Sequence, residues 1–200
     1  MKQLKLSEIL KKEYVKTAIL LAVVVISVFA FWISLTTALK TEYPMLAVAS
    51  GSMEPTLYKG DLIMVQGVST GFDINVGPKD SAEPGDVIVF HKPADPRELI
   101  VHRAIDNELR SGVWYFQTKG DANSGSDNWD GDWKTDCDLA ENFLVGKVVG
   151  HVSHIGYIPL FLREFLWTPI GMILIVTLLL IFLFYDYIPL SRKKDQQDAA

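Results

Sequence analysis

The chain has 200 residues, of which 49% are hydrophobic, and a formal net charge of −5 at pH 7. Its apolar residues are concentrated in two blocks instead of being spread periodically, which is typical of a membrane protein and argues against a single soluble domain. Residues 41–166 contain 10 Lys and Arg against 19 Asp and Glu. Nucleic-acid binding requires a basic surface, so this acidic balance argues against nucleic acid as a partner. Cys137 is the only cysteine, so no internal disulfide can form and stability must come from packing.

The first apolar block, residues 17–39, contains 23 residues without a charge. A membrane-spanning helix needs roughly 20 such residues, so we predict a transmembrane helix here. Five of the six lysines in residues 1–40 precede the block, and the positive-inside bias therefore predicts a cytoplasmic N-terminus over residues 1–16. A cleavable secretory signal is the alternative, but its apolar core usually has about 7 to 15 residues. We therefore expect a retained anchor.

The second apolar block, residues 165–185, has 21 residues without a charge and is predicted to form a second transmembrane helix. Basic residues at positions 192–194 favour a cytoplasmic tail over residues 186–200. Both termini of this multi-pass protein are thus expected in the cytoplasm, with the protein in the cell membrane. Residues 40–164 then form a domain on the extracytoplasmic side.

The predicted extracytoplasmic domain is mainly β, flanked by the two transmembrane helices. Short apolar runs alternate with turns that contain glycine and proline, a pattern typical of strands. Residues 66–82 and 120–138 have scattered small and polar residues and are predicted to be long loops. The runs that we interpret as strands are residues 45–49, 61–65, 87–90, 99–101, 113–116 and 145–149.

Ser52 lies in the stretch Ser-Gly-Ser-Met-Glu-Pro-Thr-Leu, residues 50–57, shortly after the first apolar block. A serine hydroxyl is a poor nucleophile near neutral pH unless a neighbouring base removes its proton. Gly51 permits the close approach of a substrate carbonyl, and Pro55 stiffens the following turn. Ser-Gly-Ser alone is also common in ordinary loops, so the tripeptide by itself does not establish catalysis.

A base and an orienting acid are present farther along the chain. An imidazole such as that of His102 ordinarily titrates near pH 6.5, so it can accept a serine proton and return it to a leaving amine. Asp121 and Asp127 follow in a stretch rich in Gly, Asn and Ser, and a carboxylate can fix the tautomer of the imidazole. The alternative interpretations are a strand-edge histidine, which we prefer for the other three histidines, and aspartates that only form turns.

The longer string around Ser52 closely resembles the nucleophile box of type I signal peptidases, membrane proteases that remove signal sequences from exported proteins. Bacterial members have a lysine base, whereas archaeal and endoplasmic-reticulum members have histidine followed by arginine. The residue before Arg103 is His102, so the resemblance is to the histidine branch. The family's other boxes occur in order between about residues 45 and 149: Gly60-Asp61, Gly85-Asp86 with Val-Ile-Val-Phe, Val101-His102-Arg103, and Gly120-Asp121 with Asp127.

This resemblance implies a role for each candidate residue. Ser52 is expected to be the nucleophile, His102 the general base and then acid, and Asp127 the carboxylate that orients the imidazole. Asp121 is implied as a second important acid, and which of the two aspartates contacts the imidazole is left open. The Ser50 hydroxyl is suggested to help the Ser52 amide hold the oxyanion. Neither a metal nor an organic cofactor is required.

Lys119 is the alternative base, although its pKa would have to fall by roughly three units to act at pH 7. A calcium loop is a second alternative, since residues 121, 123, 125, 127 and 132 fall at the offsets of calcium ligands. The match is poor because Gly125 has no side-chain ligand and Asp132 stands where a bidentate glutamate is needed.

Two features depart from the family pattern. Ala122 stands where asparagine often follows the Gly-Asp box, and the segment from Asp127 to Asp138 is unusually rich in Asp and Trp. Tryptophans near a bilayer often lie at its interface, which is how we interpret this segment.

The resemblance implies hydrolysis of exported preproteins after small-x-small sites, through an acyl-enzyme on Ser52. An extended substrate can add as a strand beside the apolar runs, and the lipid bilayer concentrates enzyme and substrate. One rival is a sortase-like transpeptidase that acts through Cys137, although the acidic surroundings would raise the thiol pKa. Another is a non-catalytic scaffold subunit of a secretion complex. The second span favours a free-standing archaeal enzyme, and additional subunits are left open.

Overall fold

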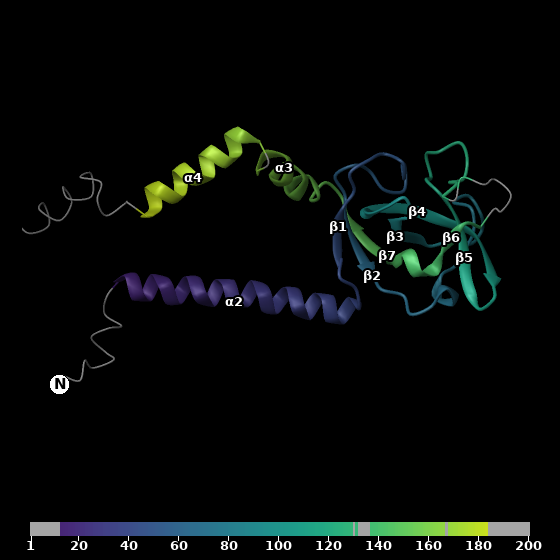
Figure 1. Cartoon of the computed structure of the whole chain (residues 1–200), viewed down its shortest axis with the longest axis horizontal. Coiled ribbons are helices and arrows are strands. Elements are labelled where there is room, and N and C mark those ends of the chain that lie inside the picture. Colours follow the sequence, from purple (N-terminus) through teal and green to yellow (C-terminus); the bar gives the residue numbers. More distant parts are fainter. Residues whose placement is uncertain (1–12, 130, 132–136, 167, 184–200) are drawn as a thin grey trace, which may run out of the picture.

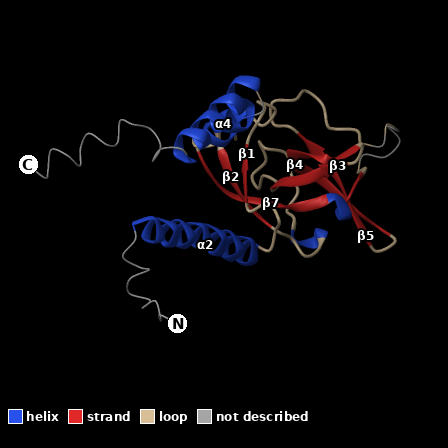
Figure 2. Cartoon of the chain, turned by 60° about the vertical axis from the view of Figure 1, so that its left-hand side comes forward, coloured by secondary structure: helices blue, strands red, loops and turns tan. Residues whose placement is uncertain are grey.

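The computed structural model describes residues 13–129, 131, 137–166 and 168–183. A β domain lies at one end, and helices extend from it (Figure 1). Helix α2, Glu13–Leu39, precedes the domain, whereas α3, Tyr157–Leu166, and α4, Pro169–Leu183, follow it. Both α2 and α4 leave on the same side of the domain (Figures 1 and 2).

Seven antiparallel strands form one sheet in the order β1-β2-β7-β3-β4-β5-β6. This confirms the prediction of a mainly β domain, and every predicted run lies in or overlaps a strand. The short β6 was not predicted. The strands are β1 Met45–Ala47, β2 Leu62–Gln66, β3 Val87–Lys92, β4 Asp95–Arg110, β5 Val113–Lys119, β6 Leu139–Ala140 and β7 Leu144–Val152, with single-turn 3-10 helices η1 at Gly71–Asp73 and η2 at Glu141–Phe143.

The central strand β3 is buried on both faces. Successive side chains of a strand point to opposite sides, and Val89 belongs to one apolar cluster while Ile88 and Phe90 belong to another. This explains why β3 reads as an unbroken apolar run instead of alternating with polar residues. The sheet therefore has packed layers on both sides, and one of them includes the loop that follows β1.

Helix α2 is attached to the sheet at its C-terminal end. Its apolar part, Val15–Leu39, is long enough to cross a membrane, and its most apolar stretch is not buried against the rest of the protein. The Gly67 N–H, just after β2, donates to the Leu39 carbonyl over 2.8 Å. A Cβ on Gly67 would lie 2.0 Å from the Lys40 carbonyl oxygen, so the two segments meet backbone to backbone. The helix ends where the sequence predicted, but it begins earlier than residue 17.

The predicted uninterrupted helix over residues 165–185 does not match the structure. Helices α3 and α4 are bent by 90° relative to each other, and among the described residues they reach the length of a span only as a pair. The break has a local cause, since Thr168 Oγ1 accepts the Gly171 N–H over 3.1 Å, as an N-cap does, and Pro169 suits the first helical position. Helix α3 also begins within residues 40–164, where a mainly β domain was expected. Residues 184 and 185 lie outside the described part of the chain.

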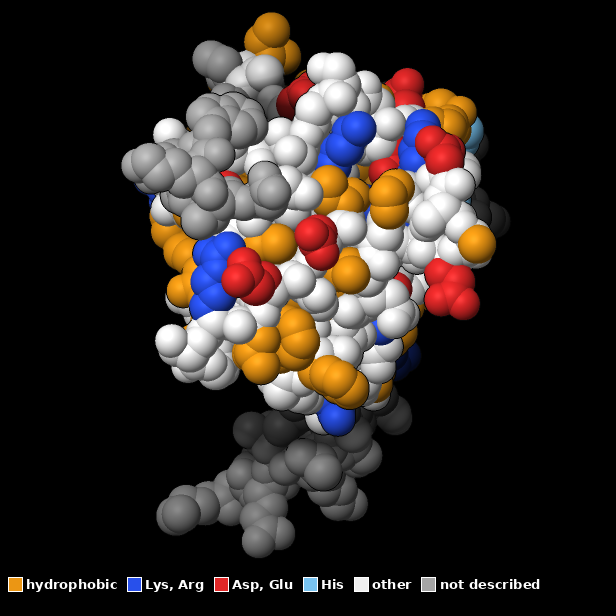
Figure 3. Space-filling view, turned by 90° about the vertical axis from the view of Figure 1, so that its right-hand side faces the viewer, with side chains coloured by type: hydrophobic (Ala, Val, Ile, Leu, Met, Phe, Trp, Pro, Cys, Tyr) orange, Lys and Arg blue, Asp and Glu red, His pale blue; other side chains and the backbone are white. Residues whose placement is uncertain are grey.

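The end of the β domain turned away from the helices has a mixed surface. Acidic and basic side chains alternate there with small apolar patches (Figure 3). Such a surface is usual for contact with water. The long apolar surfaces of the described chain are instead on α2, α3 and α4, whose large hydrophobic side chains are mostly exposed.

Candidate active site

The loop between β1 and β2 carries Ser52 and is fixed by two buried side chains. Met53 and Leu57 are 1% and 2% exposed, and both pack in the cluster that contains Val89 of β3. The Leu57 N–H also donates to the Met53 carbonyl over 2.9 Å, which closes a turn between them. Because its neighbour is anchored in the core, Ser52 is held at the surface of the domain while remaining partly shielded.

The structure brings Ser52, His102 and Asp127 together in one line. His102 is on β4, with its Nε2 3.2 Å from Ser52 Oγ and its Nδ1 2.6 Å from Asp127 Oδ2. The His102 and Asp127 side chains are only 10% and 12% exposed. A carboxylate accepts hydrogen bonds and donates none, so the neutral ring carries its hydrogen on Nδ1 and turns the lone pair of Nε2 toward the serine hydroxyl. This geometry allows an imidazole to deprotonate a hydroxyl nucleophile.

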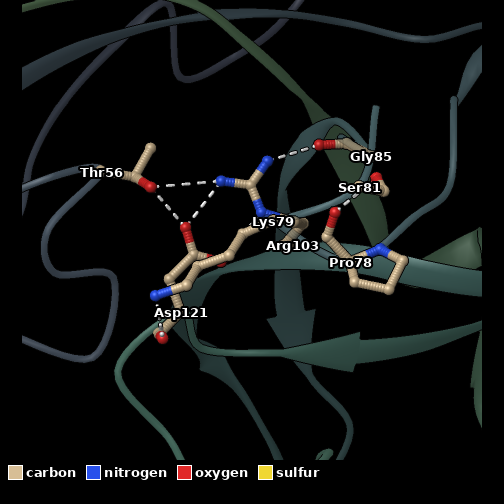
Figure 4. Close-up of polar contacts among 7 residues, drawn as sticks. All are labelled: Thr56, Pro78, Lys79, Ser81, Gly85, Arg103 and Asp121. Atoms are coloured by element: carbon tan, nitrogen blue, oxygen red, sulfur yellow. Dashed lines mark hydrogen bonds and ion pairs between the residues drawn. The ribbon is translucent and has the colours of Figure 1, made fainter. Parts of the chain in front are cut away.

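Asp121 is bonded to Arg103, the residue after His102 on β4. Arg103 Nε donates to Asp121 Oδ1 over 2.8 Å and Nη2 donates to Oδ2 over 2.6 Å. The Thr56 hydroxyl donates to the same carboxylate, and Arg103 Nη1 donates to the Gly85 carbonyl over 2.6 Å (Figure 4). The two aspartates that the sequence left undistinguished therefore have different partners.

The charge state of Asp121 follows from these contacts. Burial by itself would raise the pKa of Asp121, but the hydrogen bonds from Arg103 and Thr56, together with the Arg103 charge, outweigh burial and lower it below its ordinary value. Asp121 is thus a carboxylate at neutral pH. It links the loop that carries the serine to β4 and to the turn after β5.

A cleft of about 320 Å³ opens beside Ser52 and His102. One wall consists of residues 46–50, in and after β1, and the other of residues 98–102 of β4. In the sheet that the structure describes, β1 is an edge strand, and β5 pairs with β4 only from Arg103 onward. Each wall therefore offers a strand edge to the cleft, and an extended peptide can pair with such edges through its backbone.

Comparison with known proteins identifies the family. A family model described as "Signal peptidase, peptidase S26" matches residues 11–106. The chain is 27% identical over 181 residues to the signal peptidase complex catalytic subunit SEC11 of Tuber melanosporum, covering 88% of this chain and 94% of the relative. Identity to SEC11C of Homo sapiens is 29% over 154 residues, covering 72% and 70%. Identity to SEC11 of Lachancea thermotolerans is 30% over 155 residues, covering 76% and 85%. The chain belongs to the signal peptidase family.

As a signal peptidase, the protein is a hydrolase. The alternative of a non-catalytic scaffold subunit is therefore not supported. The sortase-like alternative also lacks support from the site. Cys137 is 4% exposed, and burial, reinforced by the negative charge of Asp106, raises the pKa of its thiol to about 11. At neutral pH the group is a buried thiol, and a thiol is not the nucleophilic form of cysteine.

Lys119 lines a different cavity of the signal peptidase from the one beside Ser52. That cavity has a volume of about 170 Å³, and Ile105 and Asp121 also line it. The cleft beside the serine is lined by His102 and not by Lys119. The alternative lysine base therefore has no geometric support among the described contacts.

The region proposed as a calcium loop uses its carboxylates for other bonds. Asp121 accepts from Arg103 and Asp127 faces His102, while Asp132 lies outside the described residues. The interpretation of the tryptophans as membrane-interface residues is wrong for Trp129, whose ring packs edge-to-face against buried Phe90 at 5.3 Å between centroids.

Two backbone features of the signal peptidase beside Ser52 were missed by sequence reasoning. The Ala122 N–H donates to the Ser52 carbonyl over 2.9 Å. A Cβ on Gly120 would lie 2.7 Å from the same oxygen. The Gly120-Asp121 box was the available sign of this close backbone approach, but only its aspartate was interpreted from the sequence. The departure from asparagine at Ala122 leaves this contact intact, because the backbone makes it.

Proposed function

We propose that this signal peptidase removes signal peptides from exported preproteins, with Ser52 as nucleophile, His102 as general base and then acid, and Asp127 as the orienting carboxylate. The proposal rests on the 3.2 Å contact between Ser52 Oγ and His102 Nε2, in a ring whose other nitrogen faces Asp127. It is supported by relatives that are named as signal peptidase catalytic subunits and match this chain over most of their length.

The proposed reaction has two steps. His102 Nε2 takes the Ser52 proton as Oγ attacks the scissile carbonyl carbon, and it then gives that proton to the leaving amine. Water, deprotonated by the same nitrogen, hydrolyses the remaining ester and frees Ser52. Asp127 keeps Nδ1 protonated and stabilises the imidazolium. The attack leaves a negative charge on the carbonyl oxygen of the substrate. We propose that the Ser52 N–H and the Ser50 hydroxyl donate hydrogen bonds to this oxyanion. The Ser50 oxygen lies 3.3 Å from Ser52 Oγ.

The substrate is proposed to bind as an extended strand between the two cleft walls. Its backbone would pair with the edges formed by residues 46–50 and 98–102, which end at the serine and the histidine. Apolar side chains such as Leu46 and Val101 line the cleft, and we propose that the pockets beside them are shallow. Shallow pockets admit only small substrate side chains, which suits cleavage after small-x-small sites.

Helix α2 is proposed to anchor the enzyme in the bilayer, with residues 1–16 in the cytoplasm and the β domain on the extracytoplasmic side. The bent pair α3 and α4 is proposed to supply a second membrane segment and to return the C-terminal tail to the cytoplasm. The relatives are named as subunits of a signal peptidase complex. All three proposed catalytic side chains come from this one chain, so we propose that it cleaves preproteins without a residue from a partner.

The test is cleavage of a synthetic preprotein by the purified full-length chain in detergent and in lipid vesicles. Ser52→Ala and His102→Ala are expected to abolish cleavage, and Asp127→Asn to lower kcat by about 10²- to 10⁴-fold. The exposed His151 gives a matched control, since His151→Ala should cleave like wild type. The rate should fall in acid as the imidazole becomes protonated. Cleavage that survives His102→Ala and appears only at alkaline pH would instead favour Lys119.

A further inference from the structure

Asp127 is the end of a chain of hydrogen bonds that begins at an indole. Trp129 Nε1 donates to Thr118 Oγ1 over 2.9 Å, and Thr118 Oγ1 donates to Asp127 Oδ2 over 2.7 Å. The same carboxylate oxygen faces His102 Nδ1 at 2.6 Å. Thr118 therefore bonds the proposed catalytic residue Asp127 directly and Trp129 is linked to it through Thr118, although neither lines the cleft beside Ser52.

The direction of this chain is fixed by the chemistry of its members. An indole N–H can only donate, so the oxygen of Thr118 accepts from Trp129. The single hydroxyl hydrogen of Thr118 is then left for Asp127, whose carboxylate can only accept. The remaining donor at that carboxylate is His102 Nδ1–H, which leaves the lone pair of Nε2 for the serine. One arrangement of protons thus satisfies every bond, and it gives the tautomer that proton abstraction requires.

The surroundings hold Thr118 and Trp129 in place without help from a substrate. Thr118 is fully buried on β5, and its backbone carbonyl also accepts the Asp127 N–H over 2.8 Å. Thr118 therefore binds Asp127 twice, once through its backbone and once through its side chain. The Trp129 ring rests on Phe90, which is itself 0% exposed. Loss of the hydroxyl would leave buried polar groups unpaired, which is costly.

We propose that Thr118, supported by Trp129, is a positioning residue that fixes the Asp127 carboxylate and, through it, the orientation and tautomer of His102. This inference rests on the proposed roles of Ser52, His102 and Asp127. Because the cleft walls do not include Thr118 or Trp129, their loss should lower kcat and leave KM nearly unchanged. A loss confined to kcat is the signature of an interaction that acts in the transition state.

The test compares four variants of the full-length enzyme on a synthetic preprotein. Thr118→Val removes the hydroxyl but keeps the side-chain shape and the backbone bond, and it should lower kcat by about 10- to 100-fold. Thr118→Ser restores the hydroxyl and should stay within about 3-fold of wild type. Trp129→Phe removes the N–H and should cost about 3- to 10-fold. Trp114→Phe, in a half-buried tryptophan of the same strand as Thr118, is the matched control and should match wild type.

The two changes act in series, so Thr118→Val combined with Trp129→Phe should be no slower than Thr118→Val alone. Wild-type kcat in Thr118→Val would overturn the inference. An equal loss of kcat in Thr118→Ser would also overturn it, because the effect would then come from packing and not from the hydroxyl. A double variant whose loss of kcat is the product of the two single losses would contradict it as well. Thermal unfolding of each variant verifies that it is folded.

Proton NMR of the imidazole N–H separates this inference from the proposed function. The low-field resonance of the hydrogen-bonded His102 Nδ1–H, identified by its absence in His102→Ala, should shift or broaden in Thr118→Val and be retained in Thr118→Ser. An inactive wild type, or an active Ser52→Ala variant, would contradict the proposed function. The resonance would still show whether Thr118 positions Asp127 and His102. An unchanged resonance in Thr118→Val would overturn the positioning role.

Discussion

The backbone N–H of Ala122 donates to the carbonyl oxygen of Ser52 over 2.9 Å. This bond joins the turn after β5 to the loop that carries the proposed nucleophile. Asp121, in the same turn, bonds Thr56 of that loop as well as Arg103. The position of Ser52 beside the cleft therefore depends on contacts with a turn that is remote in sequence.

Gly120→Ala should impair the enzyme although it adds only one methyl group. The new Cβ would lie 2.7 Å from the Ser52 carbonyl oxygen, a backbone atom that cannot rotate away. The serine loop must shift, and misplacement of a reacting group by about 1 Å can cost about 10²-fold in rate. We expect kcat/KM to fall by about 10- to 100-fold.

Gly125→Ala provides the matched control, since a Cβ there meets nothing within 4 Å. It should cleave preprotein at the wild-type rate. Equal activity of the two variants would show that the turn after β5 does not fix the position of Ser52.

Met53→Ala should destabilise the folded domain. Its side chain is 1% exposed and packs in the cluster beneath the serine loop. Truncation of a buried methionine to alanine usually costs about 2 to 5 kcal/mol. Met64→Ala, at a methionine that is 39% exposed, should cost far less. Denaturant unfolding in detergent measures both, and equal losses would contradict the anchoring role of Met53.

Asp121→Asn should destabilise the protein in a pH-dependent way. The pKa of Asp121 is lower in the folded protein than its ordinary value of 3.8. The stability that its charge contributes is therefore fully present above that value and is lost as the pH falls through the lower folded pKa. Removing one partner of a buried pair costs about 3 to 5 kcal/mol at neutral pH.

The unfolding free energies of wild type and Asp121→Asn should thus differ most at neutral pH and converge well below pH 3.8. Asp80→Asn, at an exposed aspartate, serves as the control with little change. A difference that grows in acid would have the wrong sign for a carboxylate stabilised by Arg103.

Cys137 should be unreactive in the folded enzyme. Its thiol is buried with a pKa raised to about 11, so a thiol-reactive disulfide reagent should modify it at pH 7 only after denaturation. Cys137→Ala should retain preprotein cleavage. Rapid labelling of the native protein, with loss of activity, would reopen the cysteine mechanism.

The β strands and the first helix could be predicted because their signals are local. Apolar runs and turn residues mark β1 to β5 and β7, and the uncharged run that ends at Leu39 marks α2. The second apolar block was misjudged because absence of charge does not test helix continuity. Pro169 was the available sign of a break, since proline begins helices more readily than it continues them.

From the sequence, site residues could be proposed only where the residue type itself carries a reactive side chain. Ser52, His102 and Asp127 were named as site residues from the sequence, whereas Thr118 was not named and Gly120 was named only as part of the Gly-Asp box. Thr118 pairs with Ala104 in the register between β4 and β5, which places it beside the strand that carries His102. Register between distant segments cannot be read from either segment alone, so contacts of this kind become visible only in the folded chain.

The hydrogen bond between Gly67 and Leu39 attaches the last turn of α2 to the sheet. With α2 in the bilayer as proposed, this bond would restrain the β domain from moving independently of its anchor. Only peptide bonds at one fixed depth relative to the lipid would then reach the serine. Under that proposal the anchor would set this depth, and the length of a preprotein's own apolar segment would decide which of its bonds is cut.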